Sequence, residues 1–196
     1  MATEEPAPDG KPMLSVGDAG ALERWLAAEH TRTKGVWLVR ARPGSDHPSV
    51  DYEDMINVLL CYGWIDASIK TLDEHRSLLW ISPRRKGSVW SKPNKQRLAK
   101  LAAQGRIQPP GQAVIDRAMA DGSWTTIDGA ENLEVPDDLA AAFGDDPGAR
   151  ANFDAFPPSA RKGYLGSIAM AKTPATRARR IAVTVQRSRD NLRPGA

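Results

Sequence analysis

The hydrophobic pattern changes once along this chain of 196 residues, and the change limits the folds that it can adopt. Runs 64–72 and 77–82 are typical of strands and flank the polar stretch 73–76, so they predict a β-hairpin. Beyond about Pro136 the apolar repeats have helical spacing, which predicts helices at 137–143, 147–156, 159–170 and 174–190. We therefore expect an α+β fold, with a small, mostly antiparallel sheet and packed helices, followed by an all-helical C-terminal part.

Strands and helices follow one another in the first part of the chain. Runs 12–16 and 36–41 are typical of strands. Asp18, Asp51 and Ser91 each stand before a stretch with helical spacing, and their side chains can accept hydrogen bonds from the first free N–H groups of a helix. We expect helices to begin at these three positions. The later two are expected to end at Gly63 and near Gln104, and a further helix is expected at 110–120.

Composition suggests how the chain is divided. The acidic, Pro- and Ala-rich segment 1–11 is predicted to be a disordered tail. An α+β body is predicted at 12–122, a linker at 123–136, where the pattern is polar and poorly periodic, and a helical part at 137–196.

Several classes of protein are disfavoured by what the sequence contains. The one cysteine, Cys61, excludes an internal disulfide and lies in an apolar run, so we expect a buried thiol. The first residues lack the basic and apolar regions of a signal peptide, and we find no apolar run near 18 residues. We expect a cytoplasmic protein without a membrane span; the oligomeric state is not determined by these residues.

Charge is distributed in alternating blocks although the net charge is only +3. Residues 1–83 carry a net charge of −5 and residues 84–117 one of +8. Residues 118–160 carry −8, and residues 161–196 again +8. Either the acidic block packs on the basic ones, or a basic face is available to a partner.

The densest basic segment is 79–98, in which six Lys and Arg residues follow or flank Trp80 and Trp90. Arginine offers a forked donor to phosphate or carboxylate, and the expected helix start at Ser91 adds free N–H groups. We therefore predict an anion site here, formed by Arg84, Arg85, Ser88, Trp90, Ser91 and Asn94. The alternative is structural: Arg84 and Arg85 pair with Asp66 and Asp73, and both tryptophans belong to the core.

The same stretch resembles a known family. Residues 63–66 (GWID), Asp73, Arg76, residues 82–91 (SPRRKGSVWS) and Asn94 are similar in order and spacing to the signature of the YdeI/OmpD-associated family. The resemblance continues in 121–124 (DGSW), in 171–173 (AKT), and in Thr176, Arg177 and 179–181 (RRI), and so covers most of the chain after about residue 14. Pro93 departs from the pattern. The resemblance implies a shared fold and a role in bacteriocin, cationic-peptide or stress resistance, and it brings no catalytic residues. Residues Trp64, Asp66, Asp73 and Arg76 are interpreted as supporting the site.

The last predicted helix carries Arg177, Arg180, Thr184 and Arg187 on one face. This row is either a solvated face or a basic stripe that faces nucleic acid, membrane phosphates or the acidic block. At the start of the helix, Lys172, Thr173 and Arg177 are predicted to join the anion site as donors.

Signals for catalysis are weak. The three histidines have no metal-ligand spacing, and we find neither a Gly-rich phosphate loop nor a nucleophile elbow, so we predict no metal, no cofactor and no catalytic residues. The sequence favours a binding protein for a small anionic or phosphate-bearing ligand. The alternatives are sequence-independent nucleic-acid binding, with Trp80, Trp90 and Trp124 stacking on bases, and an enzyme with Asp66 as general base.

Overall fold

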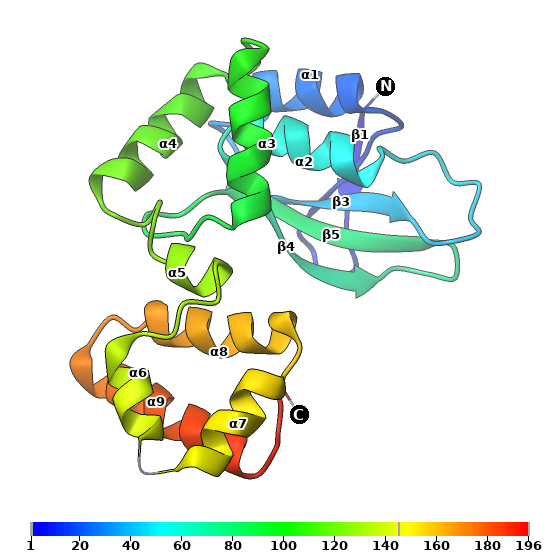
Figure 1. Cartoon of the computed structure of the whole chain (residues 1–196). Coiled ribbons are helices and arrows are strands. Elements are labelled where there is room, and N and C mark those ends of the chain that lie inside the picture. Colours follow the sequence, from blue (N-terminus) through cyan, green and yellow to red (C-terminus); the bar gives the residue numbers. More distant parts are fainter. Residues whose placement is uncertain (1, 145, 196) are drawn as a thin grey trace. The chain divides into compact units, whose positions relative to one another are not determined.

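A computed structural model describes residues 2–144 and 146–195. The chain divides into two compact units (Figure 1). The N-terminal unit contains residues 1–88 and 93–121, and the C-terminal unit contains residues 89–92 and 122–196. The predicted fold class is confirmed, because a mixed sheet with helices is followed by a region whose described elements are all helices.

The sheet of the N-terminal unit has five strands in the order β1-β2-β3-β5-β4. Their bounds are β1 Thr3–Pro6, β2 Pro12–Ser15, β3 Val36–Ala41, β4 Trp64–Thr71 and β5 Arg76–Pro83. Strands β2 and β3 are parallel and every other pair is antiparallel. The predicted hairpin is thus present as β4 and β5.

Helices α1 (Ala19–Glu29) and α2 (Tyr52–Cys61) cover one face of the sheet, which we call the helix face (Figure 1). Asp18 and Asp51 cap them as predicted, since each carboxylate accepts a hydrogen bond from a backbone N–H of the first turn. Trp25 of α1 meets Trp64 of β4 edge to face, with ring centroids 5.8 Å apart. Gly63 ends α2 with φ +71°, a conformation that favours glycine.

On the second face of the sheet lies the turn between the edge strand β1 and its neighbour β2, whose Asp9 and Lys11 contact Trp37. Here Trp37 and Trp80 stand opposite each other on β3 and β5 and pack with ring centroids 5.1 Å apart. The carboxylate of Asp9 accepts a hydrogen bond from Trp37 Nε1 at 3.0 Å and pairs with Lys70 at 3.1 Å. These contacts explain why part of the tail expected to be disordered is a strand: polar side chains anchor the hairpin where composition offers little apolar surface.

Two further helices complete the N-terminal unit, α3 (Lys92–Ala103) and α4 (Pro109–Ala120). Helix α4 approaches α2 closely at Gly111. A Cβ atom at this position would lie 2.1 Å from the carbonyl oxygen of Cys61. That oxygen also accepts the backbone N–H of Gln108 at 3.0 Å. The end of α2 is therefore joined to the start of α4 through main-chain atoms.

The C-terminal unit contains five helices within the described residues: α5 Asp128–Glu131, α6 Asp137–Phe143, α7 Pro147–Ala155, α8 Pro158–Ala169 and α9 Pro174–Arg189. Phe153 lies at the centre of its core, between the rings of Phe143 and Tyr164. Residues from the segment expected to be a linker, including Ala130, also pack on this core. Thr173 caps α9 and Pro174 follows at its first position, as predicted.

A short segment from the middle of the sequence belongs to the C-terminal unit. Residues 89–91 lie between β5 and α3 in sequence, and Lys92 is the first residue of α3. Trp90 is only 1% exposed, and its ring packs against Trp124 with centroids 5.1 Å apart. Lys92 donates a hydrogen bond to Asn132 at 3.2 Å. The chain therefore enters the C-terminal unit twice.

Candidate functional site

The basic loop after β5 is only partly open to solvent. Arg84 is 4% exposed, and burial lowers the pKa of its guanidinium to about 10, while the nearby Asp66 carboxylate acts in the opposite sense. Arg85 is exposed and Ser88 is half-buried. Of the two interpretations of the sequence, the one that places Asp66 beside Arg84 agrees with this arrangement, whereas Arg85 is accessible to a ligand.

Three other predicted residues of the N-terminal unit already have partners. The carboxylate of Asp73 forms an ion pair with Arg76 at 2.7 Å, and this contact is the main cause of the lowered pKa of Asp73. Asn94 accepts a hydrogen bond from Arg97 at 3.4 Å. Asp73 is therefore the counter-charge of Arg76, a residue three positions along the same hairpin.

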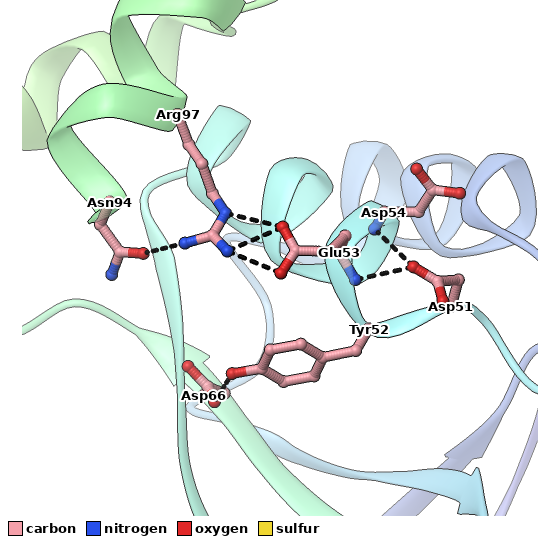
Figure 2. Close-up of polar contacts among 7 residues, drawn as sticks. All are labelled: Asp51, Tyr52, Glu53, Asp54, Asp66, Asn94 and Arg97. Carbon is pink, nitrogen blue, oxygen red and sulfur yellow. Dashed lines mark hydrogen bonds and ion pairs between the residues drawn. The ribbon is translucent and has the colours of Figure 1, made fainter.

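A polar cluster surrounds the start of α2 (Figure 2). Tyr52 donates a hydrogen bond from its hydroxyl to Asp66 at 3.4 Å. Burial, reinforced by the Asp66 carboxylate, raises the pKa of Tyr52, so the phenol is protonated at neutral pH. Arg97 of α3 reaches the same helix and pairs with both carboxylate oxygens of Glu53 at 2.7 Å. The cluster fixes the start of α2 against β4 and α3.

Beside Tyr52 the helix face of the sheet is hollowed into an open pocket of about 860 Å³. Strands β3, β4 and β5 extend beyond the start of α2, and their side chains form its floor. The loop from Ala41 to Asp51 and the ring of Tyr52 form its walls. The side chains or backbone of Arg40, Arg42, Ser49, Val50, Ile69, Lys70, Thr71, Ser77 and Leu79 also line it.

The charge of this pocket comes mainly from arginine. The guanidinium carbon of Arg40 lies 5.2 Å from the centre of the Tyr52 ring, a cation–π arrangement. The Nε of Arg40 is buried and has no hydrogen-bond partner among the described residues. Arg42 lines the pocket too, and donates to the carbonyl of Asp73 at 3.1 Å. The ammonium of Lys70 instead lies over Trp37, on the opposite face.

Five predicted site residues lie in the C-terminal unit. Trp90 is buried, as stated above, Ser91 is half-buried, and Lys172 and Thr173 are exposed. Arg177 pairs with Asp138 at 2.6 Å and so has an internal counter-charge. Because these residues and those of the basic loop belong to different units, the anion site predicted across them stays a prediction.

The arginine row of α9 faces its own unit. Arg180 donates to the carbonyl of Ser167, and Arg187 to the hydroxyl of Tyr164 at 3.1 Å. Thr184 is 2% exposed. Arg189, beside the row, pairs with Asp146 at 2.6 Å. Within the predicted row, Arg177 contacts the acidic block through Asp138, whereas Arg189, outside the row, contacts it through Asp146.

These ion pairs predict acid sensitivity of the C-terminal unit. Hydrogen bonding to Arg177 lowers the pKa of Asp138 from 3.8. Its contribution to stability is therefore complete above that value and is lost as the pH falls through the folded pKa. We expect the thermal midpoint of Asp138→Asn to fall less than that of the wild type between about pH 5 and about pH 3. Asp137→Asn, which removes the neighbouring carboxylate, should keep the wild-type pH dependence, and equal slopes for all three proteins would contradict the assignment.

Other chemistry has little support in the described part of the chain. No helix there is long and apolar enough to cross a membrane. Among the same residues, no group of three or more His, Cys, Asp or Glu side chains is placed to hold a metal ion. Cys61 is 1% exposed, as expected, and burial raises the pKa of its thiol. Of the three tryptophans proposed to stack on bases, Trp90 is 1% exposed and too buried to do so, whereas Trp80 and Trp124 are half-buried.

The pocket that contains Arg40 was not predicted from the sequence. In the sequence, Arg40 is one polar residue near the end of a predicted strand, and Tyr52 is the first residue of a predicted helix. The available signal was an arginine in an otherwise apolar run, Val36–Ala41, on the face of the strand that carries Val36 and Leu38.

The fold and the pocket define a two-unit α+β protein with a cationic pocket on its sheet. Residues 14–114 match a family model described as a domain of unknown function, DUF8412, and residues 132–191 match the family described as bacteriocin-protection, YdeI or OmpD-associated. The chain belongs to the DUF8412 family, whose model spans more than half of it, and residues 132–191 form the region that matches the YdeI/OmpD-associated domain. The stretch Trp64–Arg97, which carries the sequence resemblance, lies within the first match. No curated protein and no solved structure matches the chain.

Proposed function

We propose that the chain is a binding protein for a small anionic molecule, and that it serves the protective role for which the YdeI/OmpD-associated family is described. The observation that carries the proposal is Arg40. Its guanidinium is held over the Tyr52 ring in the wall of an 860 Å³ pocket, with a buried Nε that has no acceptor among the described residues.

Electrostatics support an anion as the ligand. A carboxylate or phosphate carries the charge opposite to that of a guanidinium and matches its forked N–H donors. Asp51, the acidic residue that lines the pocket, is engaged in capping α2 through the N–H groups of Glu53 and Asp54. Two arginine side chains and one carboxylate therefore line the pocket, which leaves positive charge for an anion to pair with.

A thermal-shift screen tests this proposal and locates the site. The panel contains phosphate, sulfate, sugar phosphates, nucleotides and short carboxylates. We expect at least one anion to raise the unfolding midpoint, because any ligand of the folded state stabilises it by RT ln(1+[L]/Kd). Arg40→Gln should weaken the binding of that anion by about 10-fold or more, as expected for the loss of a charged hydrogen bond.

Two matched variants control the screen. Arg32→Gln removes an exposed cation of the same unit that pairs with Glu29, and should leave the shift unchanged. Arg85→Ala tests the basic loop predicted from the sequence: if it removes the shift and Arg40→Gln does not, the anion binds at that loop and the pocket proposal is wrong. If no anion in the panel shifts the midpoint of the wild type, the binding function itself is rejected.

A further inference from the structure

A β-bulge shapes the floor of the pocket. Asp66 stands opposite Ile81 and Ile69 stands opposite Leu79, so β4 carries one residue more than β5 over this stretch. Because successive side chains of a strand point to opposite faces, the extra residue returns Ile69 to the face that carries Asp66. The bulge thus turns an aliphatic side chain toward the pocket that contains Arg40.

This side chain is poorly covered by the protein. Ile69 is 67% exposed, the highest value among the large apolar residues that are exposed in the described part of the chain. Its neighbours in the pocket include Leu79 of β5 and Val50 of the loop before α2. Tyr52, whose ring is held by Asp66 and Arg40, adds an aromatic edge and is itself 44% exposed. Leu79 and Val50 are themselves buried, so the pocket combines one exposed aliphatic side chain, Ile69, and an exposed tyrosine ring with arginine charge.

We infer that the ligand of this pocket is an organic carboxylic acid with an apolar body, and not an inorganic anion. The inference rests on the proposed function and specifies its ligand class. The carboxylate would pair with Arg40, and the apolar body would cover Ile69 and Leu79. A volume of about 860 Å³ agrees with this, because sites for organic ligands typically measure about 300–1,000 Å³ and are lined mainly by apolar side chains.

A homologous series of carboxylates tests the inference on the full chain. Binding of acetate, butyrate and hexanoate is measured by calorimetry or by titration of amide resonances. We expect affinity to rise by about 3-fold for each CH₂ group that enters the pocket. Hexan-1-ol, which has the same apolar body without the charge, should bind at least about 10-fold more weakly than hexanoate.

Variants assign the two parts of the ligand to their contacts. Ile69→Ser should flatten the dependence of affinity on chain length, with the largest loss for hexanoate and the smallest for acetate. Val183→Ser, which changes an aliphatic side chain that is 48% exposed on α9, should leave the whole series unchanged. Arg40→Gln should weaken the binding of every acid and should leave the binding of hexan-1-ol unchanged.

The outcomes separate this inference from the function on which it rests. One outcome is that inorganic phosphate, acetate and hexanoate bind with the same affinity and that Arg40→Gln weakens the binding of all three. In that case the proposed anion binding holds, and the inference that the ligand has an apolar body is wrong. If chain-length dependence persists in Ile69→Ser, the apolar body binds elsewhere and the inference is overturned. If no carboxylic acid binds but inorganic phosphate does, and Arg40→Gln weakens phosphate binding, only the inferred ligand class fails. If Arg40→Gln leaves the binding of every anion unchanged, both proposals for this pocket fail.

Discussion

Gly111→Ala is expected to lower the free energy of unfolding by about 3 kcal/mol or more, because it drives two helices apart. The new Cβ would lie 2.1 Å from the carbonyl oxygen of Cys61, 2.8 Å from its carbonyl carbon and 3.2 Å from the oxygen of Leu60. These are main-chain atoms of α2, so no side-chain rotation relieves the clash. Urea denaturation of the full chain measures the loss.

A Gly→Ala substitution inside a helix usually raises the free energy of unfolding, whereas at Gly111 we expect it to lower that free energy. Alanine inside a helix is normally more favourable than glycine by about 0.8–1.0 kcal/mol. Gly166 of α8 provides the control, since a Cβ there has no other atom within 4 Å. Gly166→Ala should therefore stabilise the protein. If both variants stabilise it, the close approach of α4 to α2 at Gly111 is wrong.

Trp90→Ala is expected to destabilise the C-terminal unit by about 3–5 kcal/mol, the range for removing a large aromatic side chain from a core. Trp90 is 1% exposed and packs on Trp124, although in sequence it lies between β5 and α3. Hydrogen exchange localises the effect. We expect faster exchange in the C-terminal helices, and Trp90→Phe, which keeps an aromatic ring, should lose less protection.

A matched substitution in the other unit completes this test. Trp25 is 8% exposed and packs on Trp64. Trp25→Ala should accelerate exchange in the N-terminal unit. An acceleration confined to β5 and α3 in Trp90→Ala would instead show that the segment 89–92 belongs to the N-terminal unit.

Elements with a local signal were predicted well from the sequence. The hairpin of β4 and β5 follows from two strand-like runs around a polar turn, and α9 follows from Thr173 and Pro174. Strand β1 was not predicted, because its residues are polar and exposed; the turn that follows it is anchored by Asp9 to Trp37 and Lys70, which are distant in sequence. Arg84 was predicted either to bind a ligand or to pair with Asp66; its burial near Asp66 depends on tertiary packing that charge counts do not describe.

Local sequence patterns could not predict the candidate pocket, for a similar reason. Arg40, Tyr52, Ile69 and Leu79 come from four different elements, and only the order of the strands brings them together. Even with that order known, strict alternation from Asp66 would place Ile69 on the other face. The bulge that reverses this has no Gly or Pro to mark it in residues 66–69.

The segment 89–92 also restricts how the two parts of this protein can be recombined. The two family matches, 14–114 and 132–191, are separate stretches of sequence. On sequence alone, a chimera of two related chains joined between these stretches exchanges one complete domain for another. Trp90 lies within the first stretch but packs with Trp124, which lies between them. A chimera joined after Asp121 would thus inherit the two rings of this contact from different parents. Compatible pairs at 90 and 124 should therefore decide which exchanges yield a folded helical unit.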